Sequence, residues 1–356
     1  MSESANGSGV MLVGLDQRKL QILKAIVDDY IAFAEPVGSR TIAKKYAVGV
    51  SSATIRNEMS DLEEMGYLEQ PHTSAGRIPS DKAYRLYVDQ LMNLNIIPLA
   101  EAETIKKVYE QKTAELEDIV MQTARVLCNM TNYTSVVIGP KMSKVLIKSI
   151  QLVPVDDRHA LMVVVTTAGV MKDLLLDLPQ DINRDYLIRV SNMFTDMFRN
   201  KTFAEVDLTF VPHIQKEIEK KKEFFNKLID ILSEGAASKE HKDVHLEGAT
   251  NIFNFPEYYD MLKAKEFLRL IEDKGILYNF LNTMENVGVS VVIGGENRFD
   301  ELKGYSVVTA SYKLGDKVLG SIAIIGPTRM EYSRAVSTID LVCRNLSDYL
   351  TKWFDR

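Results

Sequence analysis

The sequence predicts a multidomain α+β protein, and three observations support that prediction. The chain has 356 residues, more than a single hydrophobic core usually organises, so two or three domains are expected. Apolar residues make up 46% of the chain and charged residues 26%, which is typical of a globular protein. Segments with helical spacing of apolar residues are interspersed with short apolar runs bounded by turn residues, so both helices and strands are expected.

Composition also limits the classes of protein that the chain can represent. No apolar run reaches the roughly eighteen residues that a membrane helix needs. Residues 1–14 are small and polar and lack a basic start, so they are expected to form a flexible leader rather than a signal peptide. Cys128 and Cys343 lie in apolar surroundings, and we expect buried free thiols in a cytoplasmic protein.

The first domain is expected over residues 15–95 and begins with two helices. Apolar residues with helical spacing predict the first helix over residues 16–34, and Pro36 prevents its continuation. Residues 38–39, Gly-Ser, offer a turn and an N-cap for a short second helix over residues 39–46.

A third helix and a hairpin follow. Ser51 or Ser52 caps the helix, and Gly66 is a usual residue just after a helix end. Two short strands are expected over residues 67–70 and 77–79, joined by a tip of small residues, before Ser80 caps another helix. Helix, short helix, turn, helix and two-stranded wing is the element order of a winged helix-turn-helix.

The third helix has the side chains that a DNA-recognition helix needs. Ile55, Met59 and Leu62 share one face, which leaves small and hydrogen-bonding residues on the opposite face. Asn57 and Arg56 are suited to bidentate bonds with adenine and guanine in the major groove. An amphipathic surface helix is the alternative that this helix alone leaves open.

Charge supports the same interpretation. The net charge of −6 argues against general affinity for nucleic acid, yet residues 36–57 contain no acid and several bases. Arg77, beside Gly76, is placed to enter a minor groove or contact a phosphate, although it is also compatible with an exposed turn residue. The predicted DNA contacts are Ser39, Arg40, Lys44, Ser52, Ala53, Thr54, Arg56, Asn57, Ser60, Thr73, Ser74, Gly76 and Arg77.

The rest of the chain is expected to alternate between helices and strands. Helices are predicted over residues 101–130, 183–232, 258–272 and 334–354, and a polar linker or insertion boundary over residues 235–248. Strands are predicted over residues 135–138, 146–154, 161–167, 170–178, 289–293, 306–312 and 318–325.

Four segments carry a resemblance to a known family: EPVGSRTIAKKY (35–46), SSATIRNEMSDLEEMGYLEQPHTSAGRIPSDKAYRLYV (51–88), VVIGGEN (291–297) and YSVVTASYKLGDKVLGSIAIIGPTRMEYSRAV (305–336). They resemble the heat-inducible transcription repressor HrcA family, and a weaker match runs through the middle of the chain. The resemblance implies a homodimeric repressor of chaperone operons that binds double-stranded operator DNA, an inverted repeat called CIRCE. It also implies dependence on the GroE chaperonin. From the residues themselves we expect no cofactor and no metal.

The resemblance further implies three domains after the leader: a winged-helix domain over residues 15–95, a GAF-like antiparallel-sheet domain over residues 96–143 and 236–356, and an inserted α+β dimerisation domain over residues 144–235. Removing the insertion would join the strand at 135–138 to the late strands in one antiparallel sheet. An alternative partition starts the insertion near Ile182.

The dimer contact is expected in the insertion, because the winged-helix segment uses its apolar residues for its own small core. The leucines at 174, 175, 176 and 178, beside the strand at 161–165, form an apolar run typical of a strand covered on both faces. A second copy would supply one cover; helices of the same chain are the alternative. Residues 1–95 are accordingly expected to fold alone.

No pattern predicts an enzyme: a P-loop, a Rossmann glycine motif and a nucleophile elbow are all missing from the sequence. His241 and His245 have helical metal-ligand spacing, but their setting resembles a loop that enters a strand. Glu296 and Asn297 are compatible with a simple turn or with a small-molecule pocket. A repressor gated by a small ligand in the GAF-like domain is therefore the alternative function.

Overall fold

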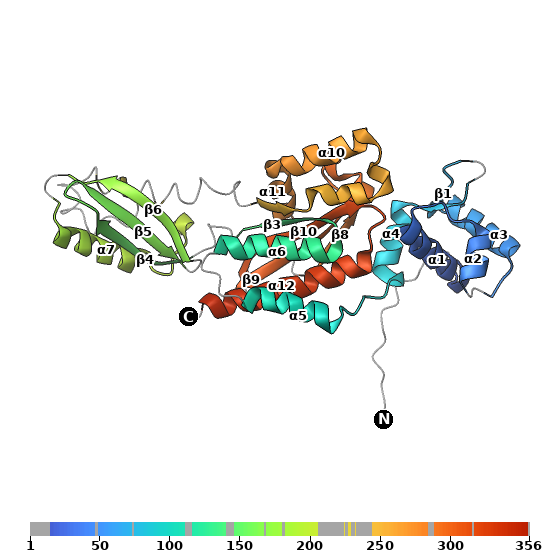
Figure 1. Cartoon of the computed structure of the whole chain (residues 1–356), viewed down its shortest axis with the longest axis horizontal. Helices are drawn as coiled ribbons and strands as arrows, with labels where there is room; N and C mark the ends of the chain where they lie inside the picture. The colour runs from blue at the N-terminus through green and yellow to red at the C-terminus, as the bar shows by residue number, and fades with distance from the viewer. Residues whose placement is uncertain are drawn as a thin grey trace, which may run out of the picture. The chain divides into compact units, whose positions relative to one another are not determined.

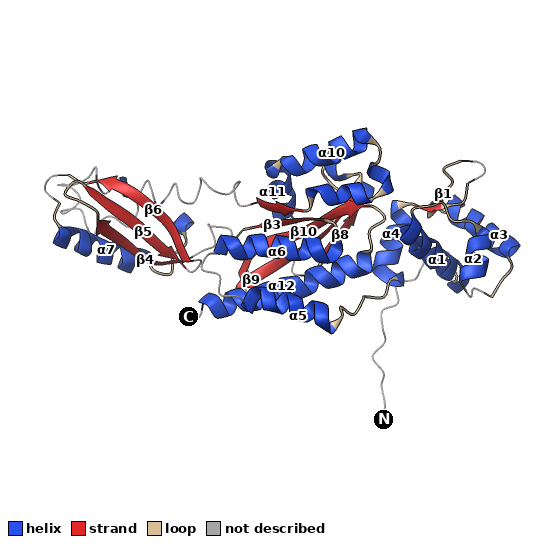
Figure 2. Cartoon of the chain, in the orientation of Figure 1, coloured by secondary structure: helices blue, strands red, loops and turns tan. Residues whose placement is uncertain are grey.

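The computed structural model divides into two compact units (Figures 1 and 2). Unit 1 contains Met1–Asn95, Val291–Ser306 and Gly326–Arg334, and unit 2 contains Ile96–Ser290, Val307–Ile325 and Ala335–Arg356. The structure describes residues 15–46, 49–72, 75–110, 116–139, 146–166, 169–179, 182–205, 224, 227–228, 232, 244–283, 288–314 and 317–354. Within these ranges no helix is both long and apolar enough to cross a membrane.

The N-terminal elements of unit 1 follow the predicted order of three helices and a hairpin. Their bounds are α1 (Gln17–Phe33), α2 (Ser39–Lys45), α3 (Ser52–Glu64), β1 (Leu68–Glu69), β2 (Ile78–Pro79), α4 (Asp81–Leu86) and the π-helical turn η1 (Tyr87–Leu91). β1 and β2 are antiparallel, with Leu68 opposite Pro79. Their shared core includes the fully buried residues Ile22, Leu23, Ile26, Ile42, Ile55, Leu62 and Leu68.

The structure identifies the N-cap residues of α2 and α3, which the sequence did not decide. The Thr54 backbone N–H donates to the Ser51 hydroxyl at 3.2 Å, so Ser51 rather than Ser52 caps α3. At α2 the N-cap residue is Gly38, which has no side chain to offer, and Ser39 is already the first helical residue.

A five-stranded sheet forms among the described residues, in the order β7-β3-β10-β9-β8. The strands are β3 (Thr134–Ile138), β7 (Val244–Glu247), β8 (Ser290–Ile293), β9 (Tyr305–Leu314) and β10 (Lys317–Pro327). β3 is antiparallel to both neighbours, with Val137 opposite Ile322 on one side and His245 on the other. The early strand therefore joins the late strands in one sheet, as predicted. β7 agrees with the strand expected around His245, although it lies inside the segment predicted as a linker or an insertion boundary.

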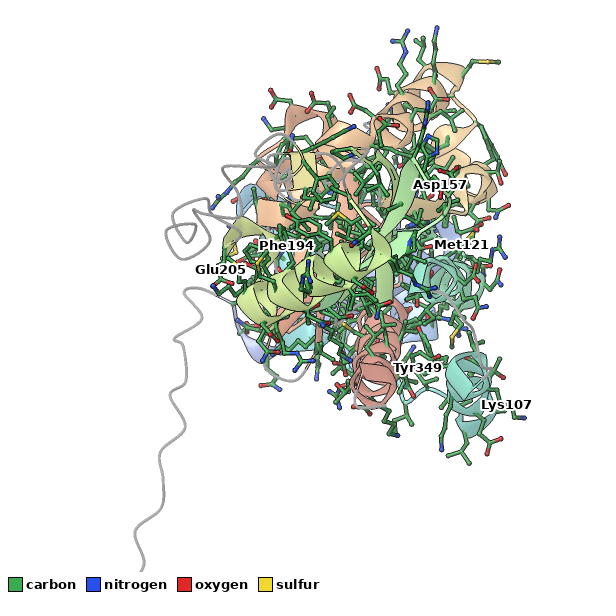
Figure 3. All side chains as sticks on the ribbon, turned by 90° about the vertical axis from the view of Figure 1, so that its left-hand side faces the viewer. Lys107, Met121, Asp157, Phe194, Glu205 and Tyr349 are labelled. Atoms are coloured by element: carbon green, nitrogen blue, oxygen red, sulfur yellow. The ribbon has the colours of Figure 1, made fainter. Side chains whose placement is uncertain are left out.

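Helices flank this sheet in unit 2. They are α5 (Leu99–Glu110), α6 (Leu116–Thr131), α10 (Met261–Glu272), α11 (Lys274–Thr283) and α12 (Tyr332–Phe354). α5 and α6 replace the single predicted helix over residues 101–130. α5 and α12 lie side by side, with the rings of Tyr109 and Tyr349 6.0 Å apart between centroids; Figure 1 shows the pair from the side and Figure 3 nearly end-on, with Tyr349 and Lys107 labelled.

A separate antiparallel sheet lies in the middle of the chain. Its strands are β4 (Ile147–Pro154), β5 (His159–Thr166) and β6 (Gly169–Asp177), in that order, and α7 (Arg184–Phe198) packs against them. Phe194 of α7, labelled in Figure 3, belongs to the core between helix and sheet, with Ile150, Met162 and Val164. Short 3₁₀ turns complete the chain at Phe203–Glu205, Ala249–Asn254, Pro256–Tyr258, Gly294–Glu296 and Asp300–Leu302.

One buried hydrogen bond crosses the five-stranded sheet. The hydroxyl of Tyr312 on β9 donates to the carbonyl of Ile138 on β3 at 2.8 Å, although β10 lies between these strands. The hydroxyl passes over Gly320 of β10, where an added Cβ would lie 2.3 Å from it. A glycine is therefore needed at this position for close approach, independently of backbone conformation.

We predict that Gly320→Ala lowers the free energy of unfolding by about 1–3 kcal/mol, because the new methyl group overpacks a buried contact. Gly304→Ala is the matched control, since an added Cβ at Gly304 meets no atom within 4 Å. Denaturant unfolding of the full chain measures both variants. Equal stability of Gly320→Ala and wild type would contradict this account of the sheet.

Candidate nucleic-acid interface

The outer face of α3 exposes the residues that the sequence singled out. Ile55, Met59 and Leu62 are buried, so the helix packs inward through the predicted face. Ala53, Arg56, Asn57 and Ser60 are exposed on the other side, and we call these four residues the contact face of α3. The contact face presents the guanidinium of Arg56, the amide of Asn57 and the hydroxyl of Ser60, and its other residue, Ala53, has only a small side chain.

The first turn of α3 is partly committed to its own cap. Besides its backbone bond to Ser51, Thr54 has its hydroxyl oxygen 3.0 Å from that of Ser51. Ser52 and Thr54 are half-buried, unlike the four residues of the contact face. Of these predicted contacts, Thr54 therefore has a structural role that the sequence did not indicate.

The acids of α3 are neutralised from within the same unit. Lys19 of α1 lies 2.6 Å from Glu58 and 2.9 Å from Asp61, and these side-chain hydrogen bonds, that of Glu58 first, raise the pKa of the Lys19 ammonium above its usual value. Arg77 lies 2.7 Å from Glu63. The negative charge in the C-terminal half of α3 is thus largely compensated.

The basic residues of this region fall into two groups. Seven of those within residues 15–95 bond to an acid or, for Lys82, to a backbone carbonyl: Arg18, Lys19, Lys24, Lys45, Arg77, Lys82 and Arg85. Arg40, Lys44 and Arg56 are exposed, and among the described residues no ion pair or hydrogen bond involves their side chains. The uncompensated positive charge therefore comes from α2 and from α3 beside the contact face, a distribution that suits phosphates flanking a groove.

Arg77 occupies a different position from the one expected of a hairpin tip. Its backbone N–H and C=O both bond to Val37 at 2.9 Å, and its guanidinium binds Glu63. Gly76 packs against the same strand-like contact, since a Cβ there would meet the Val37 carbonyl at 2.4 Å. Thr73 and Ser74, the other predicted contacts of this loop, lie outside the described residues.

α2 is held in place by residues that the sequence analysis did not select. Lys45 forms an ion pair with the buried Asp29 of α1 and lies 4.1 Å from the ring centroid of Phe33. Burial raises the pKa of Tyr46, at the end of α2, to about 12, with Asp29 contributing. Lys44 and Arg40 are both exposed, and their i, i+4 spacing puts them on one face of α2.

Glu296 and Asn297, considered above for a small-molecule pocket, are committed to internal contacts. The Glu296 carboxylate accepts from the Arg85 guanidinium at 2.5 and 2.8 Å and from the Ile293 N–H at 2.9 Å. The Asn297 amide donates to the carbonyls of Gly294, Leu302 and Tyr305, which braces the turn. Within the described ranges no group of histidine, cysteine and carboxylate side chains could hold a metal ion; His245 lies in β7, and His241 is outside those ranges.

Comparison with known proteins finds similar chains along nearly the whole length. Residues 117–336 match the family model described as HrcA protein C terminal domain. A heat-inducible transcription repressor HrcA of Ruminiclostridium cellulolyticum is 43% identical over 96% of this chain and 99% of that protein. Proteins of the same name from Clostridium tetani and Brevibacillus brevis are 42% and 40% identical, each over 96% of this chain and over 98% and 100% of their own lengths.

A solved structure, a crystal structure described as that of a hypothetical protein, aligns with a TM-score of 0.63 at 24% identity. It covers 95% of this chain and 99% of that chain, so the two share a fold.

Proposed function

The chain belongs to the HrcA family of heat-inducible transcription repressors, and from that premise we propose that it represses heat-shock genes by binding an inverted-repeat operator of the CIRCE type as a homodimer. Within this proposal, residues 15–95 form a winged helix-turn-helix, α3 enters the major groove and the β1–β2 hairpin is the wing. The observation that carries the proposal is that the exposed contact face, which includes Arg56, lies in the same helix-turn-helix as Arg40 and Lys44, and that these three cations have no ion-pair partner in the part of the chain that the structure describes.

The proposed contacts divide by chemistry. Arg56 and Asn57 bond to base edges, since their side chains have the bidentate geometry that guanine and adenine match. Arg40 and Lys44 contact backbone phosphates from α2. Ala53 and Ser60 allow close approach, and Ser39, Ser52, Thr54, Thr73, Ser74 and Gly76 remain proposed contacts of the turns. For Arg77 the pairing with Glu63 supports a role in orienting the wing, with phosphate contact through its remaining N–H groups.

We place the dimer contact on the inserted domain, proposed over residues 144–235. β5 buries one side against α7 and leaves Leu161, Val163 and Val165 half-buried on the other. Val153 and Leu175 lie directly opposite Leu161 in the sheet and are 44% and 58% exposed. An apolar sheet face of this kind is stabilised when a second copy covers it. The GAF-like domain is proposed over residues 96–143 and 236–356, around the five-stranded sheet.

Regulation by temperature and by the GroE chaperonin is part of the proposal, because the family resemblance implies it. Purified protein tested on an operator duplex with and without the chaperonin, before and after mild heating, should regain binding after heating only when the chaperonin is present. The alternative, gating by a small ligand in the GAF-like domain, predicts instead that a metabolite shifts Tm and operator affinity without the chaperonin.

The base contacts can be separated from the phosphate contacts by mutation. We expect Arg56→Ala or Asn57→Ala to weaken binding to the specific operator by about 1–3 kcal/mol and to leave binding to random DNA nearly unchanged, because base contacts carry the sequence information. Arg40→Ala or Lys44→Ala should weaken binding to all sequences and reduce the salt dependence by about one unit of slope each.

Fluorescence anisotropy at several salt concentrations provides both measurements. Arg18→Ala is the control, since this exposed arginine of α1 lies 3.5 Å from Glu58, which already neutralises it. If Arg56→Ala and Asn57→Ala lost affinity equally on operator and random DNA, these residues would have to be reassigned to the phosphates.

The dimer contact has an equally direct test. Leu175→Asp places a charge on the open sheet face and should shift the full chain from dimer to monomer in analytical ultracentrifugation, with a matching loss of operator affinity. Ile188→Asp is the matched control, because Ile188 is an exposed apolar residue of α7 in the same part of the chain, 48% exposed. A Leu175→Asp protein that stayed dimeric would place the contact elsewhere.

A further inference from the structure

The first helix after the wing, α4, is hydrogen-bonded to one segment more than two hundred residues later in the chain and packs a ring against a second. These segments, residues 291–306 and 326–334, belong to the same compact unit as residues 15–95. One follows β8 and the other precedes α12. We call the contacts of α4 and of residues 93–95 with these segments the α4 dock.

The central contact of the α4 dock is a bidentate ion pair between Arg85 and Glu296. The Arg85 guanidinium donates to both carboxylate oxygens of Glu296, at 2.5 and 2.8 Å, and also to the backbone carbonyl of Val291 at 2.6 Å. Arg85 also bonds to Asp89 one turn along the chain at 3.1 Å. Hydrogen bonding to Glu296 raises the pKa of Arg85, and the pKa of the Glu296 carboxyl is lowered by the hydrogen bond from Arg85, against the opposing effect of burial. Bidentate pairing fixes orientation as well as distance.

The turn at Gly294 and Gly295 leaves room for the first turn of α4. The Asp81 carboxylate, in the first turn of α4, accepts from the Gly295 N–H at 2.8 Å. At Gly294 the backbone has φ +47°, and an added Cβ would lie 2.2 Å from the same carboxylate. A glycine at position 294 is therefore favoured by the approach of Asp81, a remote residue, as well as by the left-handed backbone of the turn.

A second set of bonds holds the chain on either side of the dock. The Asn95 N–H donates to the Ser333 hydroxyl at 2.8 Å, and the Ser333 hydroxyl donates to the Asn93 carbonyl. Arg329 donates to the carbonyl of Ile31 at 2.9 Å, near the C-terminal end of α1, where helix carbonyls lack partners within the helix. The buried rings of Tyr84 and Tyr332 pack with centroids 5.9 Å apart.

From the dock, α4 leads directly to the C-terminal end of α3. The hydroxyl of Ser80, the cap of α4, donates to the carbonyl of Gly66 at 2.7 Å, immediately after α3. The next residue but one, Lys82, donates to the carbonyl of Met65 at 2.8 Å, and its ammonium lies 4.3 Å from the centroid of the Tyr67 ring. Short bonds thus connect Glu296 to the helix that carries the contact face, through fewer than two turns of α4.

We propose that Arg85 and Glu296 are positioning residues for operator recognition: the α4 dock fixes α3 to residues 291–306 and 326–334, so the recognition helix is attached to the rest of the chain through these segments as well as through residue 95. This inference rests on the proposed function. A dimer that reads two half-sites gains affinity from the second only if its recognition helices are held near the required spacing, because a mobile module has a lower effective concentration at its site. The dock supplies that restraint without contacting DNA.

The test compares binding to the intact inverted repeat with binding to a duplex that carries one half-site. In the full chain, Glu296→Gln, Arg85→Gln and the double variant should each weaken binding to the inverted repeat by about tenfold or more, since effective-concentration gains are on the order of 10²–10⁴. Affinity for the half-site should stay within about twofold, because the contact face is untouched. The double variant should be no weaker than the weaker single variant, because the two residues act through one pair.

Two controls separate positioning from general stability. Arg344→Gln removes an exposed ion pair within one helix, with Asp340 on α12 at 2.6 Å, and should leave both affinities unchanged. Gly294→Ala opens the dock without removing any charge and should reproduce the loss on the inverted repeat. Circular dichroism at the temperature of the binding assay establishes that each variant compared is folded.

Equal losses on half-site and inverted repeat would overturn the inference, since the pair would then act only on the stability of the N-terminal elements. Unchanged affinity of folded Glu296→Gln, Arg85→Gln and Gly294→Ala proteins for the inverted repeat would overturn it as well. A wild-type protein that did not prefer the inverted repeat over the half-site would instead contradict the proposed function, so the two failures are distinguishable.

Discussion

The interaction on which the N-terminal surface depends is the ion pair between Lys19 of α1 and two acids of α3. Lys19 is 16% exposed and Glu58 11%, so neither charge is well solvated. Arg18 also lies 3.5 Å from Glu58, and Asp61 also pairs with Lys19, so the charges form a small network in which each poorly solvated group keeps a partner. The same contact therefore holds α3 on α1 and removes the negative charge that would repel a polyanion. Arg77 likewise neutralises Glu63, another acid of α3. Stability and surface charge thus have one physical origin here.

Once those acids are compensated, the position of each remaining cation decides the character of the surface. Lys45 and Lys44 are neighbours and both are exposed, but Lys45 pairs with Asp29 and lies over the Phe33 ring, whereas Lys44 has no such partner among the described residues. A basic run in the sequence is therefore divided by tertiary contacts into structural cations and free ones. The free cations lie on α2 and α3, beside small and hydrogen-bonding side chains, which is the arrangement that phosphate contact with base recognition requires.

Long-range contacts also set the limits of the compact units. Residues 1–95 looked self-sufficient in sequence, with their own apolar periodicity and caps. In the structure, Arg85, Asp81 and Asn95 bond to residues more than two hundred positions later. The glycines at 294 and 320 belong to the same class of feature, since each is required by a side chain from another element, Asp81 or Tyr312. A pattern confined to neighbouring residues contains no information about such contacts.

Local chemistry was enough to predict most helices, the strands of both large sheets and the face that α3 buries. Ser51 could be named as a cap, and Gly66 as a helix end, because capping and left-handed conformation depend on adjacent backbone groups. For β7 the sequence indicated only that a loop enters a strand near His245, because a four-residue edge strand has too few side chains to show alternation; its pairing with β3 is decided by the tertiary structure. The partners of Glu63, Lys45 and Glu296 were decided only by the tertiary structure. Ion pairs of this kind form because burial of the apolar faces brings distant charged groups together, and the spacing of those groups along the chain does not reveal which will meet.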